Sequence, residues 1–173
     1  LALAVAWSGL AEARIVRIEI ATTEPAFEGR SFGTVGPYEK LAGKAYGAID
    51  PTSPSNRIIQ DIELAPRNAD GLVEYVTDIE ILRPKDARKA NGVLLVEAVN
   101  RGNKLAMRNF NADVPADTAD MNALKNPGDG FLMAHGYTVV FFGWQADLVA
   151  GNNRVRLEAP VARNADGSSV TGI

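Results

Sequence analysis

The sequence predicts an α/β fold, in which a parallel strand pair follows a β-rich antiparallel segment. Two largely apolar runs, at 92–99 and 137–142, predict the parallel pair, because a strand of a parallel sheet is covered on both faces. Between them, residues 130–135 have the composition of a short helix that ends at Gly136. Alternation of apolar and polar residues earlier in the chain predicts the antiparallel segment.

Four strands are expected before residue 90, each with an alternating or glycine-bent pattern: residues 15–21, 38–50, 57–64 and 72–82. The glycines within 38–50 fit a strand that bends at a corner of a sheet. In 72–82, alternate residues from Val73 to Ile81 are expected on one face. We expect 57–64 and 72–82 to pair, because Asp70-Gly71 closes a polar segment between them and is typical of a hairpin turn.

The letters of this turn occur twice. Arg-Asn-Ala-Asp-Gly stands at 67–71 and again at 163–167, where it follows an alternating run at 154–161. We interpret the repeat as two hairpins with the same turn chemistry. An internal duplication is the alternative, although the flanking residues do not match.

The composition limits the classes of function. The chain has 173 residues and a net charge of -3, so it is long enough for one domain with a core. Because there is no basic surplus to neutralise phosphates, nucleic acid is not an expected partner. The absence of cysteine excludes disulfides, thiolate metal sites and a cysteine nucleophile. The oligomeric state is left open.

Residues 1–13 are predicted to be the remnant of a secretory signal peptide. Residues 1–10 are apolar, and Ala11-Glu12-Ala13 forms an A-x-A site, so cleavage is expected after Ala13. The run is too short to span a bilayer, and no membrane span is expected. A short buried helix is the alternative. The prediction implies an exported protein, periplasmic or extracellular.

A candidate catalytic turn follows the first apolar run. Asn100, Arg101, Gly102 and Asn103 come at the carboxyl end of that strand, where open α/β sheets bind ligands. A glycine there lets backbone N–H groups point at a developing oxyanion, as acyl transfer requires. Asn100, Arg101 and Gly102 are therefore oxyanion-hole candidates. The alternative is a tight turn in which Arg101 pairs with a surface carboxylate.

A candidate substrate-binding wall follows the second apolar run. Trp144, Gln145 and Asp147 come at the carboxyl end of that strand. Since neighbouring parallel strands end at the same edge, these side chains are expected beside the turn and suit the wall of a substrate pocket. The alternative is ordinary strand-end chemistry, with Trp144 in the core and Asp147 as a turn or cap residue.

Neither a catalytic triad nor a metal site is expected within the chain. His135 is the only histidine, and it is expected to stabilise the end of the predicted helix. No serine stands in a G-x-S-x-G context. The spacing of Asp113, Asp117 and Asp120 matches no calcium loop, so these are expected to be solvated helix and cap residues. No nucleotide-binding motif occurs, and no cofactor is expected.

Four long stretches resemble the N-terminal half of a bacterial family of α/β-hydrolase-domain proteins, most of them exported: residues 29–51, 62–75, 91–104 and 130–147. The resemblance implies an α/β-hydrolase core over 57–173, preceded by a β-rich segment over 14–56. It places the turn at 100–102 where related hydrolases carry a His-Gly oxyanion turn, although no histidine stands there. It places the nucleophile, the acid and the catalytic histidine beyond Ile173.

The function expected from this resemblance is that of an N-terminal part of an exported serine hydrolase, esterase-like and inactive by itself. It would supply the oxyanion turn and the pocket wall for a small-molecule ester substrate. The alternative is a non-catalytic exported β-rich module that binds a partner or a carbohydrate.

Overall fold

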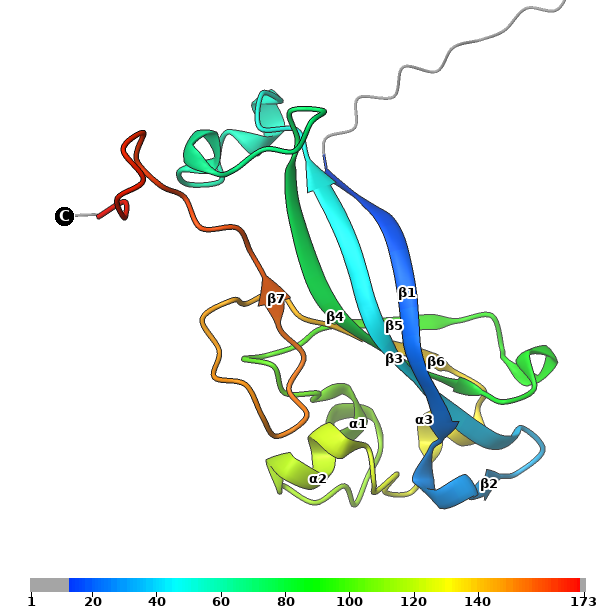
Figure 1. Cartoon of the computed structure of the whole chain (residues 1–173). Helices are drawn as coiled ribbons and strands as arrows, with labels where there is room; N and C mark the ends of the chain where they lie inside the picture. Colours follow the sequence, from blue (N-terminus) through cyan, green and yellow to red (C-terminus); the bar gives the residue numbers. More distant parts are fainter. Residues whose placement is uncertain (1–12, 172–173) are drawn as a thin grey trace, which may run out of the picture.

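A single twisted sheet organises the computed structural model, which describes residues 13–171 (Figure 1). The strands follow the spatial order β1-β3-β4-β6-β5, with β2 paired to β3 and β7 paired to β4. The strands are β1 (Ala13–Pro25), β2 (Ser31–Phe32), β3 (Gly36–Ile49), β4 (Val73–Pro84), β5 (Leu94–Ala98), β6 (Thr138–Phe142) and β7 (Leu157–Glu158). The helices are α1 (Ala106–Phe110), α2 (Thr118–Ala123) and α3 (Phe131–Ala134). They gather at one end of the long strands.

Three long antiparallel strands form the main part of the sheet. β3 pairs with β4 without interruption from Tyr38↔Pro84 to Ile49↔Val73, and β1 pairs with the other edge of β3 across two irregularities. A Cβ at Gly43 would lie 1.9 Å from the carbonyl oxygen of Glu19 in β1. Only glycine therefore permits the close approach of the two strands, which accounts for the glycine content of the predicted bent strand.

The predicted parallel pair is confirmed. β5 and β6 run parallel from Leu94↔Thr138 to Ala98↔Phe142. The predicted helix before the second strand is α3, and Gly136, with φ of 74°, donates from its N–H to the carbonyl of Met133. The glycine thus ends the helix as the sequence predicts.

The principal hydrophobic core lies on one face of the sheet. Tyr38, Leu82, Val139 and Phe141 are buried there and pack with residues of α1 and α3, including Met133. Because side chains alternate along a strand, the same strands also present a second face, on which the candidate site lies.

The predicted α/β-hydrolase fold is wrong. The structure is a β-rich mixed sheet, in which β5 and β6 are the one parallel pair among the described strands. β6 pairs on its other side with β4, antiparallel, from Ile79↔Phe142 to Leu82↔Val139. The helices α1, α2 and α3 have only 5, 6 and 4 residues. Helices this short do not cover both faces of a parallel sheet.

The predicted strand at 57–64 and its hairpin with 72–82 are also wrong. The segment forms turns, ending in a 3-10 helix at Ile62–Leu64, and Asp61 has a left-handed φ of 56°. β4 pairs instead with β3 on one edge and with β6 and β7 on the other. Strand structure in the alternating run at 154–161 is limited to the two residues of β7, which pair with Val76 and Thr77.

The two polar turns have the same hydrogen-bonding pattern, so the predicted likeness of turn chemistry is confirmed, although the predicted hairpin around 67–71 does not form. In one, the N–H of Asn68 donates to the carbonyl of Leu72 and that of Gly71 to Asn68. In the other, Asn164 N–H donates to Ser168 and Gly167 N–H to Asn164. Both glycines have positive φ, 79° and 83°, which explains why glycine closes each turn.

The predicted signal remnant at 1–13 lies outside the described residues except for Ala13, which pairs with Ile49. Within residues 13–171, no helix is long and apolar enough to cross a membrane. The segments 14–56 and 57–173 contribute to one continuous sheet, because β3 and β4 are paired along their length.

Candidate functional site

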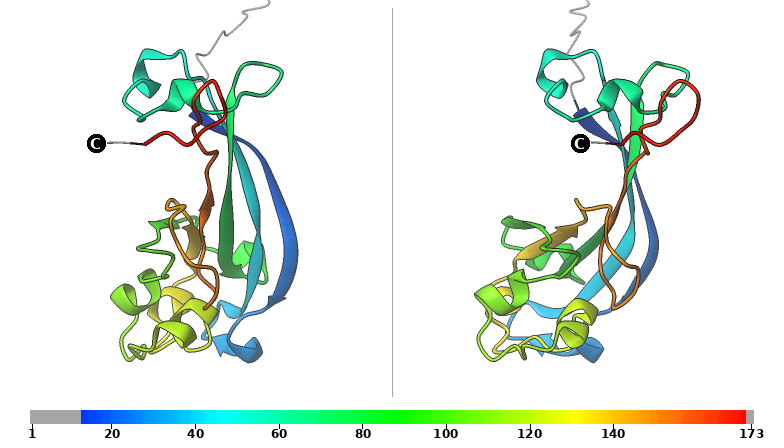
Figure 2. Two further views of the ribbon diagram at one scale, coloured as in Figure 1. Left: turned by 60° about the vertical axis from the view of Figure 1, so that its left-hand side comes forward. Right: turned by 90° about the vertical axis from the view of Figure 1, so that its left-hand side faces the viewer.

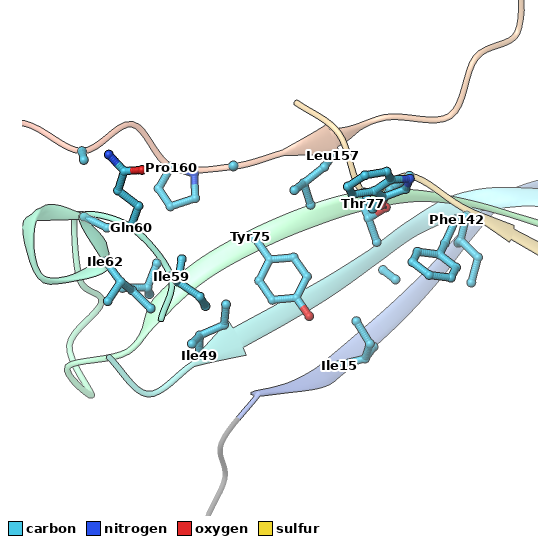
Figure 3. Close-up of a pocket in the computed structure, with 18 of the residues that line it drawn as sticks. Ile15, Ile49, Ile59, Gln60, Ile62, Tyr75, Thr77, Phe142, Leu157 and Pro160 are labelled. Carbon is cyan, nitrogen blue, oxygen red and sulfur yellow. The ribbon is translucent and has the colours of Figure 1, made fainter. Parts of the chain in front are cut away.

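An apolar groove lies on the face of the sheet opposite the core. Its volume is about 760 Å³. Val73, Tyr75, Thr77 and Ile79 of β4 form part of its floor (Figure 3). The alternation in the sequence placed these four residues on one face, and the structure confirms it.

Neighbouring strands extend this floor. Ile15 and Ile18 of β1, Ala45 and Ile49 of β3, and Val140 and Phe142 of β6 also line the groove. Val140 and Phe142 of β6 thus face the groove, while Val139 and Phe141 face the core. The floor is therefore a direct consequence of strand alternation over four paired strands.

A glycine shapes the centre of the floor. Gly47 pairs with Tyr75, and a Cβ at Gly47 would lie 2.0 Å from the Tyr75 ring. The ring therefore lies across β3 in the space that the missing side chain leaves. Figure 3 shows the hydroxyl of Tyr75 directed along the floor toward the side of Ile15.

Two segments far apart in the sequence form the walls at one end. One is 59–62, which supplies Ile59, Gln60, Asp61 and Ile62, and the other is 157–162, just after β7 begins. Both gather at the end of the long strands away from the helices (Figure 2). The N–H of Arg163 donates to the carbonyl of Leu64 at 3.2 Å, which ties the two walls together.

The polar groups of the groove are few. The Thr77 hydroxyl donates to the carbonyl of Gly143 at 2.5 Å, so its proton is in use. Burial raises the pKa of the Tyr75 hydroxyl, which stays a neutral phenol. Asp61 is the one ionisable side chain besides Tyr75 among the described residues that line the groove.

The predicted oxyanion turn and the predicted wall are in contact. The backbone N–H of Arg101 donates to Oε1 of Gln145 at 2.7 Å, and the Arg101 guanidinium lies 3.3 Å from Oδ2 of Asp147. The indole N–H of Trp144 donates to the carbonyl of Val99 at 2.7 Å. The expected meeting of the two strand ends is therefore observed.

Two backbone N–H groups of the turn, those of Arg101 and Asn103, have acceptors. Arg101 and Gly102 have positive φ, 49° and 80°, and the N–H of Asn103 donates to the carbonyl of Asn100 at 3.0 Å. A Cβ at Gly102 would lie 2.8 Å from Cβ of Arg154. The geometry is that of a tight turn with Arg101 beside a carboxylate, and the oxyanion role of Asn100, Arg101 and Gly102 stays a prediction.

Of the three residues predicted to form a substrate-binding wall, one lies in the groove and two contact the turn at 100–103. Trp144 lines the apolar groove and is 54% exposed, so it is not a core residue. Gln145 and Asp147 bind the turn instead. Trp144 therefore stands between the groove and the turn.

A buried polar network lies beneath the turn, and it was not predicted. The side chain of Lys104 is fully buried. Its Nζ donates to Oε2 of Glu80 at 2.7 Å and to the carbonyl of Asn122 at 2.5 Å. Asn122 in turn donates to the side chain of Asn103 at 2.9 Å. Burial lowers the pKa of Lys104, and the ion pair with Glu80 opposes that effect.

Glu97 belongs to the same region. Its carboxylate accepts hydrogen bonds from the N–H groups of Leu105 and Ala106, at 2.8 and 2.7 Å, at the beginning of α1. Burial nevertheless raises the pKa of Glu97. One signal that could have revealed the network is Glu97, the one charged residue in the otherwise apolar β5. Glu80 stands in an alternating strand and gives no such signal.

His135 is at the end of α3, where its Nδ1 lies 2.8 Å from the carbonyl of Phe131. This is the structural position that the sequence predicts. Among the described residues, no group of three or more His, Asp or Glu side chains is arranged to hold a metal ion.

Trp144 is thus the predicted site residue that reaches the groove, and the turn at 100–103 is held beside it by Gln145 and Asp147. The resemblance to exported α/β-hydrolase-domain proteins stays a prediction, because comparisons with family models, curated proteins and solved structures give no match.

Proposed function

We propose that this chain binds an uncharged apolar small molecule, with an alkyl or acyl chain, in the groove on the open face of its sheet. One observation carries the proposal. A hollow of about 760 Å³ is lined almost entirely by aliphatic and aromatic side chains. Small-molecule sites have volumes of about 300–1,000 Å³ and this kind of lining.

The shape of the groove favours a small molecule over a protein partner. The segments 59–62 and 157–162 rise from the floor as walls, and the Arg163–Leu64 hydrogen bond joins them. Protein partners bind more readily to open apolar patches. Among residues 13–171, neither Lys nor Arg lines the groove, so these residues offer no cation to an acidic ligand.

This proposal agrees with the binding-module alternative that the sequence raises. It excludes a carbohydrate as the ligand, because a carbohydrate needs many hydrogen-bonding groups in its site and the groove offers few. The β-rich architecture is compatible with such a module, since the open face lies on antiparallel strands that need only one covered face.

A chain-length series tests the proposal. The neutral fluorescent probe N-phenyl-1-naphthylamine is bound first, and methyl esters from hexanoate to tetradecanoate then displace it. Each buried CH₂ contributes about 0.8 kcal/mol, or roughly fourfold in affinity. We expect affinity to rise with length until the groove is full. No probe binding, or affinity independent of length, would contradict the proposal.

Two neighbouring isoleucines provide a matched pair of variants. Ile59 lines the groove and is 42% exposed, whereas Ile58 is 88% exposed and does not line it. Ile59→Asp is expected to weaken probe binding at least tenfold, because it places a charge in the apolar wall. Ile58→Asp is expected to leave binding unchanged. Equal effects of the two variants would contradict the assignment of the groove.

Ester hydrolysis is a second proposal, and one observation favours it. Trp144 lines the groove and also donates to Val99 at the base of the turn at 100–103. An acyl chain in the groove would therefore end near the candidate oxyanion residues.

The nucleophile and general base have no candidates in the described chain, so this proposal expects Ser and His in the gene beyond Ile173. We expect this chain alone to leave p-nitrophenyl octanoate intact and the full gene product to hydrolyse it. A full gene product without hydrolytic activity would contradict the proposal.

A further inference from the structure

Tyr75 holds a hydroxyl group in the middle of the apolar floor. The ring is fixed by its position over Gly47, where a Cβ would lie 2.4 Å from the hydroxyl oxygen and 2.0 Å from the ring. β4 and β3 are in uninterrupted register around this pair. The hydroxyl therefore has a defined place, directed along the groove toward the side of Ile15.

This hydroxyl has no hydrogen-bond partner among the described residues. Two other tyrosines of the chain contrast with it. Tyr38 donates to the carbonyl of Tyr137 at 2.9 Å, and Tyr46 donates to Oε2 of Glu19 at 2.9 Å. The hydroxyl is only half-buried, so it is open to solvent in the free protein. An apolar ligand that displaces this solvent leaves the donor unpaired, which is costly, unless the ligand itself accepts the hydrogen bond.

The surroundings of Tyr75 decide which ligand group fits. Burial raises the pKa of Tyr75, so at neutral pH the phenol keeps its proton and donates. The nearest polar lining residue on β4, Thr77, already donates to Gly143. In the part of the chain that the structure describes, no Lys or Arg lines the groove, and Asp61 lies in its wall. A neutral acceptor is therefore favoured over a carboxylate.

We propose that the Tyr75 hydroxyl is the polar anchor of the groove and donates a hydrogen bond to the carbonyl oxygen of a neutral ester or ketone on the apolar ligand. The inference rests on the proposed function of the groove and names the class of ligand. Tyr75 is a specificity residue in this role, since the aliphatic lining accepts any chain whereas the hydroxyl selects for a carbonyl.

The test compares two ligands of similar size, methyl octanoate and nonane, each displacing N-phenyl-1-naphthylamine from the protein. Tyr75→Phe removes only the hydroxyl. We expect this variant to bind methyl octanoate about fivefold more weakly and nonane with unchanged affinity. Tyr46→Phe is the matched control, because Tyr46 lies on the other face of β3 and bonds to Glu19. It is expected to leave both affinities unchanged.

The outcomes separate this inference from the function on which it rests. Failure of the wild-type protein to bind the probe or either ligand would overturn the groove as a binding site. Binding of both ligands with equal losses, or no loss, in Tyr75→Phe would overturn the anchor alone. The wild-type protein adds an independent measurement: methyl octanoate is expected to bind more tightly than octanoate at neutral pH, and the reverse order would overturn the neutral-carbonyl assignment.

Discussion

The two faces of the sheet differ although the same strands form them. On the helix-covered face, Leu82, Val139 and Phe141 are fully buried. On the open face, Ile15 and Ile18 are about half exposed and line a groove. Because successive residues point to opposite faces, one set of strands supplies both the core and the binding surface. The difference indicates that the fold derives its stability from one face and leaves the other available to a ligand.

The two faces of the sheet also differ in the charged side chains that they contain. The covered face contains the ion pair of Lys104 with Glu80, whose Lys104 side chain is fully buried. The open face has an almost wholly apolar lining. A face with buried charge is sensitive to the loss of one partner, whereas an apolar open face is sensitive to added charge.

The largest effect is expected from breaking the buried ion pair. Lys104→Met leaves Glu80 without its partner and is expected to lower the free energy of unfolding by about 3–5 kcal/mol. Urea denaturation measures the loss. Lys44→Met is the control, because the Lys44–Asp78 pair is partly exposed and is expected to contribute less than about 1 kcal/mol. The double variant Lys104→Met with Glu80→Leu should recover much of the stability, and no recovery would contradict the ion-pair explanation.

Matched leucine variants compare the two faces directly. Leu82 is 0% exposed on the covered face, and Leu94 is 55% exposed on β5. Leu82→Ala is expected to cost about 2–5 kcal/mol because it leaves a cavity. Leu94→Ala is expected to change stability by less than about 0.5 kcal/mol. Chemical denaturation of the two variants measures the difference, and similar losses would mean that the open part of β5 is covered in solution.

A change at Gly47 is expected to affect stability and binding together. In Gly47→Ala the new Cβ meets the Tyr75 ring, and the ring must move into the groove. We expect a loss of about 1–3 kcal/mol, as in overpacked sites, and weaker binding of N-phenyl-1-naphthylamine. A variant that loses stability but keeps full probe affinity would show that the ring position does not shape the groove.

The smallest effect concerns the pH dependence of the covered face. The pKa of Glu97 is raised in the folded protein by burial, so the folded chain holds this proton more tightly than the unfolded chain. The resulting stability is present below the unfolded pKa of about 4.5 and is lost as pH rises through the folded pKa. Glu97→Gln is expected to remove this part of the pH dependence, with a change of about 1 kcal/mol at α1. Denaturation series from acidic to neutral pH compare the two proteins, and identical pH profiles would contradict the assignment.

Local patterns in the sequence correctly predicted the strands whose residues face the core and the open face in turn. The alternation from Val73 to Ile81 identified β4 and its groove face, and the apolar runs identified β5 and β6 as a parallel pair. The contact of Arg101 with Gln145 followed from the common edge of that pair. For β5 the run overstated the burial, because Leu94 and Val96 are more than half exposed.

The remainder depended on contacts between distant segments. Residues 57–64 contain isoleucines because Ile59 and Ile62 line a groove wall, and a local pattern does not distinguish this from a strand. The hydrolase fold was predicted from a family resemblance together with the parallel pair, and the antiparallel pairing of β6 with β4 lies outside both. Lys104 and Glu80 resemble surface residues until the tertiary structure brings them together.

The long return of the chain to β4 has a consequence for the order of folding. β1, β3 and β4 are close in sequence, whereas β7 reaches β4 only after β5 and β6, and the Lys44–Glu158 contact closes a separation of 114 residues. Contacts of large sequence separation form slowly because a long loop must close first. We expect the floor of the groove to be assembled early in refolding and the wall beyond β7 last. The refolding protein should therefore become able to bind a ligand only in its slowest kinetic phase, after most of the secondary structure has formed.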